Sequence, residues 1–293
     1  MKVYSYEIVT SAGRLLDDAD KPKFTVRVVA ERVGVPTATL RSWNQRYGVG
    51  PSEHSPGRHR LYSENDITIV QHMHELIDQG ASPRGAARLA IESVKPPHGD
   101  VDSVLSAALA LDLASLGRML ESHLRHFGVL DTWDLVVRPA FADIVGRQED
   151  GEGCVDVEHA LSWSVSRALQ RLPVAPLDAS ASTVLACTSA ETHALPIEAL
   201  RAALGEAGHG ALMLGADVPR SALTDAIARV RRPVTVVLWS QTAETADMET
   251  VRAVATEAKV LIGGPGWTAV DVVDPAMRVF SLREAVERCL RQT

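Results

Sequence analysis

Residues 24–48, FTVRVVAERVGVPTATLRSWNQRYG, carry the signals for two short helices joined by a tight turn. Thr25 is suited to begin the first helix, and Gly34 to end it, because glycine readily adopts the left-handed conformation that closes helices. A second helix follows at once, with Leu40 and Trp43 at helical spacing, and we expect both in the core. Two short helices around a glycine turn predict a helix-turn-helix, whose second helix enters the major groove of DNA.

Basic residues are concentrated around this stretch. Residues 21–62 carry eight Lys or Arg and two Glu, whereas the whole chain has a formal net charge of −7. A basic segment on an acidic body is typical of a DNA-binding domain attached to a regulatory domain, although charge alone fits a solvated basic face equally well. The helix-turn-helix pattern favours the DNA-binding interpretation.

The next segment extends the pattern. GRHRLYSENDI, residues 57–67, predicts a small β-ribbon followed by a helix capped at Ser63, which begins a helix pair that ends in QGASPRGAARLA at residues 79–90. Residues 24 to about 92 resemble the winged helix-turn-helix of MerR-type transcription regulators. The resemblance implies contacts with double-stranded promoter DNA from the second helix and the wing, at Thr37, Thr39, Arg41, Arg46, Tyr47, Arg58, His59, Arg60 and Tyr62. Guanidinium groups suit such contacts because they pair bidentately with phosphate oxygens.

Two linkers divide the rest of the chain. KPPHGD interrupts the first helical region, and PVAPLDASAS closes the second. Between them apolar residues recur every three or four positions, with short connections, which predicts an antiparallel bundle of about four helices. We therefore expect an N-terminal tail, a DNA-binding domain, a helical bundle and a C-terminal domain at residues 1–22, 23–95, 100–175 and 181–293.

The C-terminal region has a different period. TVLACTS, GALMLGAD, VTVVLWSQ and KVLIGG are short apolar runs that are each followed by a helical segment, and RVFS is a candidate fifth strand. This alternation predicts a parallel, Rossmann-like (flavodoxin-like) sheet with helices on both faces, so the whole chain is multidomain α plus α/β. Ligands bind such sheets at the carboxyl ends of the strands, where ETHALP, LGADVP, WSQT and GGPGW lie.

His193 lies in ETHALP, on the first predicted strand-to-helix turn. The order of bundle, Glu-x-His motif, serine and paired glycines resembles the cobalamin-binding domain of the CarH/LitR-like branch of MerR regulators. The resemblance implies cobalamin as the cofactor and His193 as the axial ligand of its cobalt. It implies cofactor contacts at Gln148, Glu158, His159, Glu191, His193, Ser240, Gly263 and Gly264.

Three residues depart from that family's pattern. Pro196 replaces the motif glycine, Gln148 replaces a bundle tryptophan, and Glu149 stands where some light-responding members have histidine. Proline removes an N–H but suits the first turn of a helix, and an amide in place of an indole makes a pocket more polar. Three interpretations of His193 therefore stay open: an axial ligand, part of a crevice for another flat or tetrapyrrole-like ligand, or an ordinary polar loop residue.

Motifs of other function classes are missing from the sequence. GGPGWTA lacks the Lys-Ser/Thr pair of a phosphate loop, there is no His-Glu-x-x-His, and the three cysteines are too widely spaced for a zinc pattern. We therefore expect no enzyme and no catalytic residues. No apolar run approaches the roughly 20 residues of a membrane span, and the N-terminus has no signal core, so we expect a cytoplasmic bacterial protein that joins the nucleoid when bound.

The sequence thus predicts a DNA-binding transcription regulator whose C-terminal region senses a ligand, with cobalamin as the candidate, and controls oligomeric state and DNA binding. A dimer or tetramer is expected because paired half-sites usually supply the contacts that one small helix-turn-helix lacks. The alternative is a ligand-independent DNA-binding regulator whose degenerate cobalamin-like domain serves protein–protein contacts.

Overall fold

The computed structural model describes residues 23–51, 61–94, 96–177, 182–269 and 276–291. The chain forms two compact units, Met1–Lys95 and Pro96–Thr293, and each is described by itself. Among the helices in the described ranges, none combines the length and apolar character that a membrane crossing requires.

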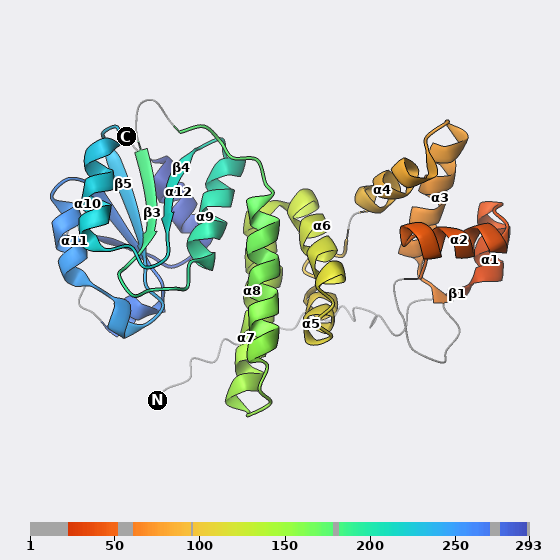
Figure 1. The fold of residues 1–293 in the computed structure, drawn as a ribbon, viewed down its shortest axis with the longest axis horizontal. Helices are drawn as coiled ribbons and strands as arrows, with labels where there is room; N and C mark the ends of the chain where they lie inside the picture. Colours follow the sequence, from red (N-terminus) through yellow and green to blue (C-terminus); the bar gives the residue numbers. More distant parts are fainter. Residues whose placement is uncertain (1–22, 52–60, 95, 178–181, 270–275, 292–293) are drawn as a thin grey trace, which may run out of the picture. The chain divides into compact units, whose positions relative to one another are not determined.

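The first unit contains a helix-turn-helix with a two-stranded sheet (Figure 1, red and orange). Its elements are β1 (Phe24–Thr25), α1 (Val26–Val33), α2 (Thr37–Tyr47), β2 (Leu61–Tyr62), α3 (Glu64–Asp78) and α4 (Pro83–Ser93). Gly34 ends α1 in the left-handed region with φ 74°, as its sequence position predicts. Ser63 and Asp66 form a reciprocal capping box that begins α3. Local sequence signals therefore set the ends of these helices.

The core of the first unit contains the predicted Leu40 and Trp43, and it also contains Tyr62. Leu40 is fully buried and Trp43 is 8% exposed. Successive strand residues point to opposite faces, so in β2 Leu61 is exposed while Tyr62 is only 2% exposed. The expectation that Tyr62 lies open as a phosphate contact of the wing is therefore corrected: its ring packs in the core.

The second unit begins with the helical bundle. Its elements are α5 (Val101–Leu109), α6 (Leu113–Thr132), the π-helical turn η2 (Trp133–Val137), α7 (Arg138–Glu149) and α8 (Val155–Gln170). Gly128 kinks α6 with φ 76° and ψ 178°. The next N–H, of Val129, donates to Glu206 of the sheet domain at 2.9 Å. The kink is thus tied to the sheet domain by a hydrogen bond.

A five-stranded parallel sheet follows, with strand order β4-β3-β5-β6-β7. Its elements are β3 (Ser182–Cys187), α9 (Leu195–Glu206), β4 (Ala211–Gly215), α10 (Arg220–Arg229), β5 (Val234–Trp239), η3 (Ala243–Thr245), α11 (Met248–Ala255), β6 (Lys259–Gly263), η4 (Pro265–Ala269), β7 (Met277–Val279) and α12 (Leu282–Leu290). The candidate fifth strand is present as β7. The predicted parallel, flavodoxin-like sheet is confirmed, and its strand order is that of a doubly wound fold.

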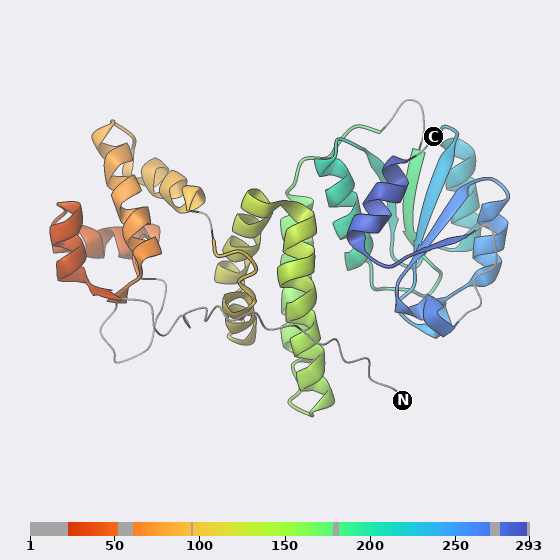
Figure 2. The same cartoon turned by 180° about the vertical axis from the view of Figure 1, so that it is seen from behind.

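Helices cover both faces of the sheet. Alternation along β3 sends Leu185 to the face packed by α9 and α12, and Val184 to the face packed by α10 and α11. Figure 2 shows α12 beside α9 on the first of these faces. Leu161 of α8 belongs to the same hydrophobic core as Leu185. The bundle and this face of the sheet therefore share one hydrophobic core.

Candidate ligand-binding site

The loops after β3, β5 and β6 meet at the carboxyl edge of the sheet. β3 lies between β4 and β5, so the chain leaves β3 in one direction and β5 in the other. Such a reversal of strand order opens a crevice between the two loops. The β3 loop carries Glu191 and His193, and Ser240 directly follows β5. The fold therefore brings together residues that are about 50 positions apart in the sequence.

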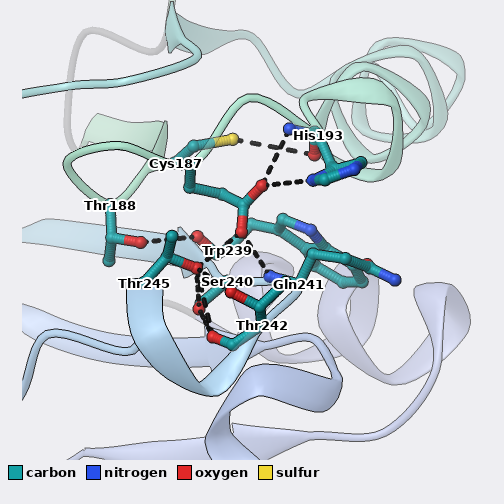
Figure 3. A network of polar contacts seen from close by, with 9 residues as sticks. Cys187, Thr188, His193, Trp239, Ser240, Gln241, Thr242 and Thr245 are labelled. Carbon is teal, nitrogen blue, oxygen red and sulfur yellow. Dashed lines mark hydrogen bonds and ion pairs between the residues drawn. The ribbon is translucent and has the colours of Figure 1, made fainter.

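Glu191 lies at the centre of this edge and is 1% exposed. Its Oε1 accepts hydrogen bonds from the backbone N of His193 at 2.8 Å and from His193 Nδ1 at 2.6 Å. Its Oε2 accepts from the backbone N of Gln241 and from Thr245 Oγ1, both at 2.7 Å (Figure 3). One buried carboxylate thus joins the β3 loop to the β5 loop.

These hydrogen bonds keep the Glu191 carboxylate ionised. Burial would raise the pKa of Glu191, but the bonds from Thr245, His193 and Gln241 outweigh it and lower the pKa from 4.5 to about 2. An ionised carboxylate only accepts hydrogen bonds, so Nδ1 of His193 must donate. In the neutral imidazole this leaves the lone pair on Nε2, the nitrogen that faces away from Glu191. The His193 side chain is 56% exposed, which leaves Nε2 available to a ligand.

Ser240 stabilises the β5 loop beside Glu191. It is fully buried, and its hydroxyl lies 2.9 Å from the carbonyl oxygen of Thr242 and 2.8 Å from Thr245 Oγ1. Thr245 in turn donates to Glu191. Ser240 therefore orders the β5 loop that holds Glu191, instead of presenting its hydroxyl to the crevice.

Close packing surrounds the paired glycines at the end of β6. A Cβ at Gly264 would lie 2.1 Å from the carbonyl oxygen of Ser240, and Gly264 has φ 109°. A Cβ at Gly263 would lie 3.3 Å from the Trp239 ring. Only glycine fits the backbone at 264, and both glycines make room for Trp239.

A cavity of about 920 Å³ opens between this edge and the bundle. Its volume suits a large cofactor, since ligand pockets commonly enclose roughly 300–1,000 Å³. Four of the predicted cofactor residues line it, namely Glu158, His193, Gly263 and Gly264. Much of the remaining wall was not predicted from the sequence, and it includes Trp133, Arg138, Phe141, Trp163, Trp239, Arg278 and Phe280. Of these residues, only Trp239 could be placed near the site from the sequence, because it directly precedes Ser240 at a predicted strand end.

The other predicted cofactor residues lie apart from the cavity wall. Gln148 donates to Glu158 Oε2 at 2.8 Å, so these two α7 and α8 side chains satisfy each other. His159 is exposed and is not among the described lining residues. Glu191 and Ser240 lie beneath the wall and position it. The structure therefore separates the predicted set into residues that line the cavity and residues that support it.

Pro196 lies in the first turn of α9, which begins at Leu195. The N–H groups of a first helical turn have no partner within the helix, so a proline there removes no helical hydrogen bond. Pro196 also lines the cavity beside His193. The proline at this position is therefore compatible with the hydrogen bond between Glu191 and His193.

The predicted DNA-contact residues of the first unit are distributed over α2 and the wing. Arg41 and Arg46 are exposed on α2, while Thr37, Thr39 and Tyr47 are half-buried. Arg58, His59 and Arg60 lie outside the described residues. α2 therefore presents two arginines outward from a helix whose inner face, with Leu40 and Trp43, packs in the core.

Comparisons with known proteins bear on both units. Residues 24–91 match the family of MerR HTH regulatory proteins. The HTH-type transcriptional repressor CarH of Myxococcus xanthus is 27% identical over 226 residues, which are 71% of this chain and 76% of CarH. The repressor CarA of the same organism is 27% identical over 255 residues, 82% of this chain and 86% of CarA.

A solved structure shares the fold of the second unit. The monomethylamine corrinoid protein of Methanosarcina barkeri covers 66% of this chain and 98% of its own length, with a TM-score of 0.53 and 14% identity. At that identity the likeness shows the fold alone. The chain is therefore a DNA-binding transcription regulator that has a MerR-type helix-turn-helix domain at residues 24–91, is similar to CarH and CarA over most of its length, and has in its second unit the fold of a corrinoid protein.

Proposed function

We propose that the second unit binds a cobalamin through His193, and that the bound state controls self-assembly and the affinity of the first unit for promoter DNA. The contact between Glu191 and His193 is the observation that carries this proposal. It holds the imidazole in one orientation, with Nε2 directed away from the carboxylate at the wall of a large cavity. A carboxylate behind an imidazole is the usual arrangement around a metal-binding histidine.

The residues present fit such a cofactor. A bound cobalamin would supply a cobalt centre with a coordination position that an imidazole nitrogen can fill. His193 would occupy that position, Gly263 and Gly264 would leave space at the edge of the sheet, and Glu158 would face the ligand from the bundle. Gln148 is engaged with Glu158, so the bundle wall is polar there, while Phe141 and Trp163 supply aromatic surface elsewhere on it.

DNA binding by the first unit would use Arg41 and Arg46, whose guanidinium groups are exposed on α2. Thr37, Thr39 and Tyr47 on the same helix, and Arg58, His59 and Arg60 of the wing, complete the proposed contact set. Two or four copies would be needed to span paired half-sites, since one such domain buries little DNA surface. No turnover of a substrate is part of this proposal, and the cytoplasm is the compartment it implies.

Gln148 supports a second candidate function. Its hydrogen bond to Glu158 leaves that pair satisfied without any ligand. In this alternative the protein binds DNA and regulates transcription independently of cobalamin, and the second unit makes protein–protein contacts.

Absorption spectroscopy separates the two candidates. Purified protein is incubated in the dark with hydroxo-, methyl- or adenosylcobalamin, desalted, and measured before and after illumination. His193→Ala removes the proposed ligand. His98→Ala is the matched control, because His98 is 53% exposed in the same unit and is likewise paired with a carboxylate, that of Asp131 at 3.4 Å.

Cobalamin binding predicts retained corrin absorbance in the wild type and His98→Ala, and a lost or altered spectrum in His193→Ala. Absence of retained absorbance in the wild type would favour the ligand-independent function. Light scattering of the same samples reports whether the ligand changes the oligomeric state. DNA binding by His193→Ala without ligand should persist, because the variant leaves the first unit unchanged.

A further inference from the structure

Trp239 has a buried donor without a partner at the wall of the cavity. Within the part of the chain that the structure describes, its indole Nε1 is buried and makes no hydrogen bond. The nearby Trp267, by contrast, donates its Nε1 to the carbonyl oxygen of Gly263 at 3.0 Å. A buried donor without a partner is unfavourable, because it loses its hydrogen bond with water and gains none in return. The current position of the Trp239 ring is therefore not its best one for hydrogen bonding.

The backbone of Trp239 is fixed within the sheet, whereas its ring is only partly buried at the edge of the core. Trp239 is paired with Cys187 in β3 and with Gly263 in β6, and its carbonyl oxygen accepts from the backbone N of Thr188 at 3.1 Å. The ring itself lies against the backbone of Gly263 and Gly264 and beside the hydrophobic core. Rotation about the side-chain bonds would thus move the indole without disturbing the sheet.

The cavity provides the space for such a rotation. Trp239 and His193 line the same cavity of about 920 Å³, and Figure 3 draws both side chains at the carboxyl edge of the sheet. Because solvent does not reach Nε1 in its present position, an acceptor can bond to it only after the ring has turned. A ligand that fills the cavity would bring that acceptor.

We propose that the Trp239 indole is a ligand-responsive wall, which turns away from Gly263 and Gly264 when ligand enters and donates its Nε1–H to an oxygen acceptor on the ligand. This inference rests on the proposed function, in which the peripheral amide oxygens of a corrin are the acceptors. It makes Trp239 a residue that selects for ligands with an oxygen at this position.

Trp239→Phe tests the inference, because it keeps an aromatic ring and removes the N–H. The variant without ligand should melt at the same temperature as the wild type or higher, since an unsatisfied donor has been removed. Its affinity for hydroxocobalamin, measured by absorbance titration, should fall about tenfold, as expected for one lost hydrogen bond. If Trp239 served packing alone, Trp239→Phe would lower the melting temperature of the ligand-free protein. It would not combine an unchanged or higher melting temperature with a lower affinity.

Nuclear magnetic resonance of ¹⁵N-labelled wild type gives a second readout, for which Trp239→Phe serves only to assign one peak. The chain has five tryptophans, and the indole peak of Trp239 is the one missing from Trp239→Phe. Hydroxocobalamin should shift this peak downfield, while that of Trp267, already bonded to Gly263, should move little.

An unmoved Trp239 peak in liganded wild type, or equal affinities of wild type and variant, would overturn the inference while leaving cobalamin binding standing. If the wild type binds no hydroxocobalamin, the proposed function and this inference fall together. Those two results are distinguishable in the wild-type titration alone.

Discussion

The carboxylate of Glu191 and the imidazole of His193 lie 2.6 Å apart, measured from Oε1 to Nδ1, and one residue separates them in the sequence. Oε1 also accepts a hydrogen bond from the backbone N of His193. Oε2 accepts hydrogen bonds from Gln241 and Thr245 of the β5 loop. The pair therefore orients the histidine and also connects two loops at the edge of the sheet. Both roles can be tested separately.

Acid should weaken the fold through Glu191. Its folded pKa is lowered from 4.5 to about 2, so its contribution is present above pH 4.5 and is lost as the pH falls towards 2. A shift of this size corresponds to about 3 kcal/mol in the free energy of unfolding. Glu191→Gln should therefore be less stable than wild type at pH 7, with a gap that narrows towards pH 2 in urea titrations. A gap independent of pH would contradict this account.

Gly264→Ala should strongly destabilise the second unit. The positive φ alone costs roughly 1–3 kcal/mol for a residue with a Cβ, and the Cβ would also lie 2.1 Å from the carbonyl oxygen of Ser240. Gly146→Ala is the control, because that helical glycine has open space around it, and it should gain about 0.5–1 kcal/mol. Urea unfolding of both variants measures the difference, and equal stabilities would show that the β6 loop adapts.

DNA affinity should depend on Arg41 and Arg46. Removing a guanidinium that contacts phosphate weakens binding at all sequences and reduces the salt slope by about one unit. Arg27→Ala is the control, since Arg27 lies in the same unit and is paired with Glu31 at 3.1 Å. Fluorescence anisotropy with promoter DNA at several salt concentrations gives both quantities. Affinities of Arg41→Ala and Arg46→Ala equal to that of Arg27→Ala would remove α2 from the proposed DNA surface.

The cysteines should differ in reactivity. Burial raises the pKa of Cys187 to about 12, with the charges of Glu191 and Glu198 adding to the effect, and burial also raises that of Cys289 to about 12. Cys154 is partly exposed. A thiol reagent at pH 8 should thus modify one of the three cysteines in the native protein and all three in denaturant. Rapid modification of Cys187 in native protein would indicate that the β3 strand end opens.

The sequence by itself determined the elements and placed Glu191 and His193 in one short loop. Capping residues such as Ser63 and Gly34 act on the residues next to them, so they predict helix ends without tertiary information. The alternation of apolar runs and helical segments likewise predicted the parallel sheet. The partners Glu191 and His193 could be proposed because they share one short loop.

Only the tertiary structure decided which side chains are buried or face the cavity. Tyr62 is in the core because β2 pairs with β1, a contact between residues nearly 40 positions apart. Ser240 supports the β5 loop instead of facing the crevice, and Gln148 is engaged by Glu158 across two helices. The cavity is lined by residues of the bundle and of the loops at the strand ends. Trp163 and Trp239 meet there only because segments far apart in the sequence pack together, and local patterns do not encode that packing.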